Sequence, residues 1–307
     1  MRKVLVLAVL TACGTGLEAE SESDFGTATW EEVPAQVDHA FAAHLNLRKG
    51  EARRGGGSTA LMSYHNGPVL TSATTYAIFW GSEWASATFA GDKISGIQSF
   101  LTGFNASNYA GTSTEYYDLL GNSKFYVSRN VAYGGDWLDS SSAPASALTP
   151  KQAVAEVCAV TGNAPAANGV YFIYTSTGAG AVNYCAWHSS GACANGAPVQ
   201  VAYMPNIDGL AGCNPGDTWT THSEGLAALA NVTAHELSEA LTDPRATAWY
   251  DASGQENGDK CAWAFVGPVT LSNGTTWKLQ MEWSNNAYST ATGYANLQGQ
   301  RGCLQGQ

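Results

Sequence analysis

The stretch that most constrains the fold is Asn231 to Pro244, NVTAHELSEALTDP, which predicts a helix with a defined end. On one side of a helix from about Ser223 to Thr242 lie Leu226, Ala230, Thr233, Leu237 and Leu241, and on the other lie Ala228, Asn231, His235 and Glu239. Pro244 disfavours the helical conformation at the residue before it, so the helix ends there. We therefore expect an amphipathic helix whose apolar face meets the core and whose polar face lines a cleft.

The polar face of this helix carries residues that suit metal chemistry. His235, Glu236 and Glu239 follow the spacing of the zinc-hydrolase motif HExxH, with glutamate in place of the second histidine. Residues four apart lie one above the other on a helix, so His235 and Glu239 can share a metal ion while Glu236 lies at their flank. A catalytic zinc takes three protein ligands and one open position. The helix thus provides two ligands and a base, and the third ligand must come from elsewhere.

The candidates for the third ligand are acidic residues beyond the turn and two histidines. They are Asp243, Asp251, Glu256, Asp259, His188 and His222. The run Glu256 to Cys261 is favoured, because a glycine-containing turn tied down by a cysteine can hold a carboxylate rigidly. Glu256 and Asp259 both fit, and the spacing does not choose between them. His188 is expected at the surface and His222 near the start of the helix. The competing structural interpretation is a solvated helix face or a buried histidine paired with a carboxylate.

Composition excludes some classes of partner. The 307 residues are 45% hydrophobic and only 13% charged, which is enough apolar chain for a large core and typical of a rigid extracellular protein. The formal net charge of −11 argues against nucleic acid or an anionic membrane surface as the main partner.

The N-terminus predicts export. Arg2 and Lys3 precede the apolar run Val4 to Leu10, and Leu10 to Cys13 resembles the lipobox of bacterial lipoproteins. The run is too short for a transmembrane helix. We expect residues 1–13 to be a signal peptide, with either lipid attached at Cys13 or an ordinary secretory cleavage. Both alternatives place the protein outside the cytoplasm, and membrane contact is expected only through the lipid.

Six further cysteines predict three disulfides in an oxidising compartment. Proximity favours the pair Cys185 and Cys193, and we expect Cys261 with Cys303 and Cys158 with Cys213. A zinc knuckle is the alternative, but the chain has no CxxC pair.

The chain divides into a flexible tether over residues 14–60 and one domain over residues 61–307. The tether contains a short predicted helix at 37–47. In the domain, strands are expected at 75–80, 124–132, 169–174 and 199–204, helices at 92–103 and 151–160, and a loop at 176–197. Residues 277–283 are expected to pair with 268–271. Alternating strands and helices predict an α/β or α+β fold: a mixed sheet with packed helices, a zincin-like active-site helix and a disulfide-stapled irregular C-terminal subdomain.

Several motifs, in order, resemble the phosphate-induced protein or Exordium-like family, which has bacterial members. They are MSYHNGPVL from Met62, the strand end Phe79-Trp80-Gly81, AHELSEALTDP, Ala248-Trp249-Tyr250 and ENGDKC from Glu256. The resemblance covers most of residues 61–303. The family is known from extracellular, cell-wall-associated plant proteins. It implies that the HELSE motif, the Trp-Tyr pair and the acidic turn form one constellation, with Trp249 and Tyr250 expected to bind substrate. Cys13 departs from the plant pattern.

Two functional hypotheses follow. The first is an exported zinc hydrolase, in particular a metallopeptidase acting on peptides or proteins. Zinc would be held by His235, Glu239 and either Glu256 or Asp259, and Glu236 would take a proton from the attacking water. Two or three carboxylate ligands would lower the positive charge on zinc and weaken its Lewis acidity. Calcium, or no metal at all, are therefore alternatives. The second is a non-enzymatic extracellular protein that binds cell-wall polysaccharide through its aromatic residues and uses the same cluster structurally.

Overall fold

The computed structural model describes residues 37–40, 44–51 and 60–307. The predicted signal peptide, Cys13 and most of the predicted tether lie outside these residues. The described part is an α+β fold in which helices pack on a mixed sheet and three disulfides are present, as predicted. Within it, no helix has the length and apolar character needed to cross a membrane.

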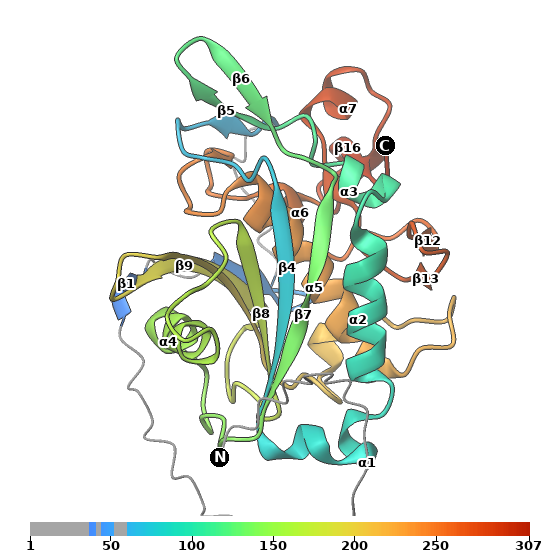
Figure 1. The fold of residues 1–307 in the computed structure, drawn as a ribbon. Coiled ribbons are helices and arrows are strands. Elements are labelled where there is room, and N and C mark those ends of the chain that lie inside the picture. The colour runs from blue at the N-terminus through green and yellow to red at the C-terminus, as the bar shows by residue number, and fades with distance from the viewer. Residues whose placement is uncertain (1–36, 41–43, 52–59) are drawn as a thin grey trace, which may run out of the picture.

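A seven-stranded mixed sheet forms the centre of the molecule (Figure 1). Its strands are β1 (Val37–Ala40), β2 (His44–Leu47), β4 (Ala73–Trp80), β7 (Val131–Asp139), β8 (Gly169–Thr175), β9 (Tyr184–Cys193) and β10 (Pro198–Met204). The order is β1-β9-β10-β8-β4-β7, and β2 also pairs with β9. Strands β10, β8, β4 and β7 are parallel, whereas β9 runs antiparallel to β10 and pairs antiparallel with β1 and β2.

Both faces of the sheet are covered, so its central strands are apolar on both sides. Along β4, Ile78 belongs to the core under α4 (Pro150–Val160), and its neighbour Phe79 belongs to the opposite core. That second core lies beneath α2 (Lys93–Phe104) and α5 (Glu224–Thr242). Figure 1 shows α4 and α2 on opposite sides of the sheet.

The long helices begin and end where the sequence predicts. Thr149 forms a capping box at the start of α4, and the hydroxyl of Ser223 accepts a hydrogen bond from the Leu226 amide, 3.1 Å away, at the start of α5. Asp243, directly before Pro244, is the C-cap of α5. The prediction that the polar face of α5 lines a cleft is wrong, however, because every residue of α5 from Leu226 to Thr242 is buried. Its polar face is covered by α6 (Asn257–Lys260) and by the segment around Gln280.

Short elements complete the described part. They are β3 (Ser63–Tyr64), η1 (Ser82–Ala85), α1 (Ala87–Ala90), α3 (Asn108–Gly111), β5 (Tyr117–Leu120), β6 (Ser123–Tyr126), η2 (Ala211–Cys213), β11 (Trp249–Tyr250), β12 (Val269–Thr270), β13 (Thr276–Trp277), β14 (Glu282–Trp283), α7 (Asn285–Ser289), β15 (Tyr294–Ala295) and β16 (Arg301–Leu304). The expected C-terminal pairing is only half right: β13 pairs with β12, but β14 pairs with β16.

Three further expectations about elements are wrong. Residues 37–47 hold β1 and β2 instead of a helix, because the open edge of β9 offers backbone partners that outweigh local helix propensity. The end of the predicted tether therefore joins the sheet. Residues 176–197 contain β9 instead of being one loop. The strand expected at 124–132 is split between β6 and β7, because β6 pairs with β5 in a hairpin whereas β7 pairs with β4 in the central sheet.

The disulfides join Cys158 to Cys193, Cys185 to Cys213 and Cys261 to Cys303. The third pair is as predicted, and the first two correct the expected pairing. Cys185 and Cys193 lie eight positions apart on the extended strand β9, which separates them by roughly 26 Å. Because a disulfide needs Cα atoms within about 7 Å, each must pair with a different element.

Peptide mapping of the non-reduced protein should find these three pairs. Cys185→Ser together with Cys213→Ser should lower the free energy of unfolding by about 3 to 4 kcal/mol, because the disulfide closes a 28-residue loop. Denaturant unfolding measures this loss. A peptide joining Cys185 to Cys193 would contradict the assignment.

Candidate metal centre

Two histidines and four carboxylates meet between α5, β9 and α6. His235, Glu236 and Glu239 come from α5, His188 comes from β9, and Glu256 and Asp259 come from the start and the body of α6. All are buried except Asp259, whose side chain is 23% exposed. This metal-ligand cluster joins three elements that are far apart in the sequence.

The first group in the cluster is the His235 triad: His235, Glu239 and Asp259. Nε2 of His235 lies 3.0 Å from Oε1 of Glu239 and 3.8 Å from Oδ1 of Asp259. The side-chain amide nitrogen of Gln280 lies 2.7 Å from the other ring nitrogen, Nδ1, while Nε2 faces the carboxylates. A tetrahedral zinc with bonds near 2.0 Å places its ligand atoms about 3.3 Å apart, so the observed separations fit one ion.

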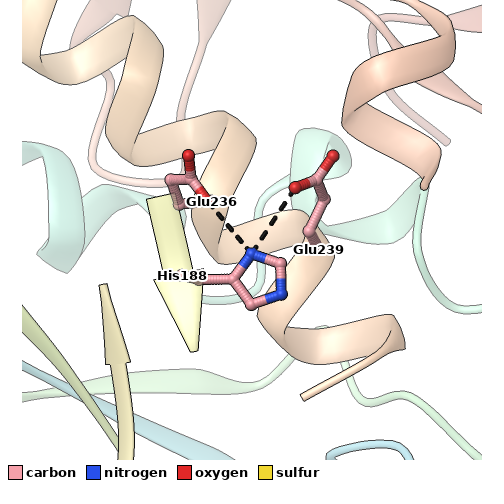
Figure 2. Close-up of side chains that lie close together, drawn as sticks. All are labelled: His188, Glu236 and Glu239. Atoms are coloured by element: carbon pink, nitrogen blue, oxygen red, sulfur yellow. Dashed lines mark hydrogen bonds and ion pairs between the residues drawn. The ribbon is translucent and has the colours of Figure 1, made fainter. Parts of the chain in front are cut away.

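The second group is the His188 triad: His188, Glu236 and Glu239 (Figure 2). Nδ1 of His188 lies 3.0 Å from Oε2 of Glu236 and 3.5 Å from Oε2 of Glu239. On the other side of the ring, Nε2 lies 3.6 Å from Oε2 of Glu256. Of the two residues predicted as the third ligand, Asp259 therefore lies near His235, whereas Glu256 lies near His188.

Electrostatics couple the two imidazoles to the carboxylates. Burial lowers the pKa of His188, but its hydrogen bonds to Glu236 and Glu239 outweigh burial and raise that pKa to about 10. His235 is likewise raised well above the usual histidine pKa, because the charge of Glu239 outweighs burial. Burial and then the charge of Glu239 raise the pKa of Asp259 to about 8. Without a metal ion, protons therefore occupy several atoms that a cation would need.

Burial also acts on the pKa values of the three glutamates of the cluster. Burial raises the pKa of Glu236, and burial followed by the charge of Glu239 raises that of Glu256 well above its usual value. Glu239 is different, because the charge of His235 and the hydrogen bond from His188 outweigh burial and hold its pKa below the usual range. Glu239 is thus the ionised centre of the cluster.

Gly258 allows α6 to approach this closely. A Cβ atom added there would lie 2.9 Å from both Oε1 of Glu239 and Nδ1 of His235. The next amide, that of Asp259, donates a 3.0 Å hydrogen bond to the same Glu239 oxygen. A side chain at position 258 would therefore push the acidic turn away from α5.

Other predicted ligands serve different roles. Oδ1 of Asp243 accepts hydrogen bonds from the Thr247 and Ala248 amides at 2.6 and 2.8 Å, which stabilises the turn after α5. Asp251 forms a buried ion pair with Lys260 at 2.9 Å. The half-buried His222 stacks on Trp277 just before the N-cap of α5.

Trp249 and Tyr250 lie in β11 and make packing contacts. The Trp249 indole is buried against Tyr64 and donates to the Tyr117 carbonyl at 2.7 Å, while Tyr250 stacks on His65 with ring centroids 3.6 Å apart. The contacts of Trp249 are those of a core residue. A role for the pair in substrate binding stays a prediction.

His188 is the residue that the sequence argument underestimated. The expectation of a surface histidine is wrong, because its side chain is buried among the carboxylates. The run Tyr-Cys-Ala-Trp-His from Tyr184 is rich in aromatic and small residues, which permits a strand. In a strand, His188 must point away from the face of Trp187, and this alternation was the available signal.

The cluster is closed. A surface cavity of about 500 Å³ lies elsewhere, lined by residues that include Tyr64, Asp118, Phe125 and Arg245, and no cluster residue lines it. The partly exposed side of Asp259 is the cluster's contact with solvent.

Comparison with known proteins gives one informative similarity. No family model matches the chain. Over 258 residues the chain is 25% identical to Protein EXORDIUM-like 5 of Arabidopsis thaliana, an alignment that covers 71% of this chain and 68% of the relative. This similarity supports the Exordium-like relationship predicted from the motifs.

Gly258→Ala should weaken binding of a divalent cation by about 10- to 100-fold, because the new methyl group displaces the acidic turn from His235 and Glu239. Calorimetric titration with Zn²⁺ measures the change. Gly267→Ala is the matched control, since an added Cβ there has its nearest neighbour 4.0 Å away. Equal affinities for the two variants would show that the approach at Gly258 is not needed.

Binding of Zn²⁺ should release protons and weaken as the pH falls from 8 to 6. The metal-free cluster holds protons at His188, with a pKa of about 10, and at Asp259, with a pKa of about 8, so the cation must displace them. Titrations at pH 7 in two buffers of different ionisation enthalpy measure the protons released. Identical heats in both buffers would contradict the expectation.

Proposed function

We propose that this chain is an extracellular Exordium-like protein whose core holds a divalent transition-metal ion at the His235 triad. The observation that carries the proposal is Nε2 of His235. This atom is fully buried and has no partner at hydrogen-bond geometry, and it forms ion pairs with the Glu239 and Asp259 carboxylates at 3.0 and 3.8 Å. A buried polar atom of this kind is costly unless an ion or another partner satisfies it. Three disulfides point to an oxidising, extracellular location.

The donor set favours zinc over calcium. Calcium takes six to eight oxygen ligands, whereas imidazole nitrogen suits zinc and related transition metals. The His235 triad offers one imidazole and two carboxylates, with separations near those of a tetrahedral site. This donor set matches zinc and related transition metals.

The enclosure of the cluster supports a structural role for this ion. A peptidase needs room for an extended chain beside the metal, and α5 is covered on its polar face by α6 and the Gln280 segment. An ion here would instead join α5 to α6 and neutralise buried carboxylates. The protein would then act outside the cell as a binding protein with a metal-stabilised core.

The proposed partner on this interpretation is cell-wall polysaccharide, although the tryptophans lend it little support. Trp80, Trp84, Trp249 and Trp263 are buried, and their rings are used in packing. Trp219 is 39% exposed, but Nζ of Lys278 lies over its ring, 4.4 Å from the centroid.

A zinc-dependent hydrolase acting on peptides is the second candidate. It is favoured by Glu236, whose Oε2 lies 3.0 Å from His188, whose charge interacts with His235 and Glu239, and whose Oε1 is buried and makes no hydrogen bond. A bound zinc would polarise a substrate carbonyl and lower the pKa of water. Glu236 would accept the proton, and Asp259 marks the side from which solvent reaches the centre.

The purified protein should contain at least one equivalent of zinc per chain, and chelation should lower its melting temperature. An ion at 100 times its Kd stabilises the folded state by about 2.7 kcal/mol. Metal analysis and thermal unfolding, with and without chelator, measure both effects. Glu239→Gln should abolish the difference, whereas Glu224→Gln, in the exposed first turn of α5, should preserve it. Metal-free protein that is insensitive to added Zn²⁺ would overturn the proposal.

If the centre is hydrolytic, Glu236→Gln should lower the cleavage rate of a denatured protein substrate by about 100-fold or more, because it removes the proton acceptor. Metal content, measured on the same sample, distinguishes a rate lost with the proton acceptor from a rate lost with the metal ion. Absence of zinc-dependent cleavage in the wild type, or full cleavage by the variant, would remove the hydrolase candidate.

A further inference from the structure

Glu239 is shared by the two triads, and its two oxygens face different histidines. Oε1 lies 3.0 Å from Nε2 of His235, and Oε2 lies 3.5 Å from Nδ1 of His188. We propose that the cluster is a two-metal centre, in which Glu239 bridges one divalent cation at the His235 triad and a second at the His188 triad. This inference rests on the proposed metal-binding function and extends it.

The distances fit two ions better than one. Within each triad the ligand atoms lie within 4.8 Å of one another, but the two histidines do not belong to a common group. Separations of 3.0 and 3.5 Å around His188 again lie near the roughly 3.3 Å expected for ligands of one tetrahedral ion. Two-metal sites in proteins hold their ions about 3.5 to 4 Å apart, a separation that one bridging carboxylate spans.

Charge is compatible with the same conclusion. Glu236, Glu239, Glu256 and Asp259 contribute four negative charges when all are ionised, and two divalent cations with neutral imidazoles balance them. In the metal-free cluster, protons on Glu256 and Asp259, whose pKa values are raised, provide part of this compensation.

The surroundings of the second triad point to a ligand independently of the charge count. Glu236 is fully buried, and its Oε1 makes no hydrogen bond although its Oε2 lies 3.0 Å from His188. On the far side of His188, Glu256 lies 3.6 Å from Nε2. At this distance Glu256 forms an ion pair with His188 on the side of the ring opposite Glu236 and Glu239.

The two-metal centre gives Glu236 a different role from that in the hydrolase hypothesis. As a ligand of the second cation, Glu236 cannot also be the free base beside the first. Its replacement should therefore change the number of bound ions as well as any reaction rate.

Titration of the metal-free full chain with Co²⁺ tests the inference. We expect two equivalents per chain by metal analysis after desalting, and one equivalent for His188→Gln and for Glu236→Gln. His222→Gln is the matched control, because this histidine stacks on Trp277 outside the cluster, and it should retain two. In the wild type, the electron paramagnetic resonance signal of the first Co²⁺ should be attenuated when the second binds, because Glu239 couples the two ions.

The outcomes separate the inference from the proposed function. One equivalent in the wild type, lost in His235→Gln but kept in His188→Gln, overturns the two-metal centre and leaves the single site standing. Two equivalents with additive, uncoupled signals also overturn it. No bound Co²⁺ overturns both proposals. If His188→Gln does not fold, the wild-type stoichiometry and spin coupling still decide.

Discussion

The burial of the Glu239 carboxylate between two imidazoles is the interaction on which the centre of the molecule depends. An ionised carboxylate is costly in the interior unless several groups compensate its charge. Here His235 on the same helix, His188 on β9 and the Asp259 amide all approach its two oxygens. Helix α5, strand β9 and the turn at α6 must therefore hold their positions together.

Two disulfides and the close packing of Gly258 against α5 hold β9, α5 and α6 in these positions. The Cys185–Cys213 bond ties down the start of β9, three residues before His188, and the Cys261–Cys303 bond ties down the end of α6. Gly258 lets α6 lie directly against Glu239 and His235. Strands β1 and β2 pair with one edge of β9 and β10 pairs with the other, so the strand that carries His188 is hydrogen-bonded on both sides. The proposed metal ion, enclosed in this way, would stabilise the core and would be poorly accessible to a polymeric substrate.

Local signals were sufficient for much of the fold. Thr149-Pro150 marks the start of α4, Ser223 and Pro244 mark the ends of α5, and the β-branched and aromatic runs of β4, β8 and β10 were recognised. The assignments of residues 37–47 and of β9 are wrong, because these strands form through pairing with distant segments: β1 and β2 with β9, and β9 also with β10. His188 was missed for the same reason. If residues 176–197 form a loop, nothing in the sequence specifies which way the His188 side chain points.

By itself the sequence determined that His235 and Glu239 share one face of a helix, because four-residue spacing is a property of the α-helix alone. It also placed the acidic candidates for the third ligand between Asp243 and Asp259. Only the tertiary structure decided that Asp259 approaches His235, that Glu256 approaches His188, and that both faces of α5 are buried. These outcomes depend on how β9 and α6 pack against α5. Contacts between segments so far apart in the chain are set by packing and burial of the whole domain, which no local spacing encodes.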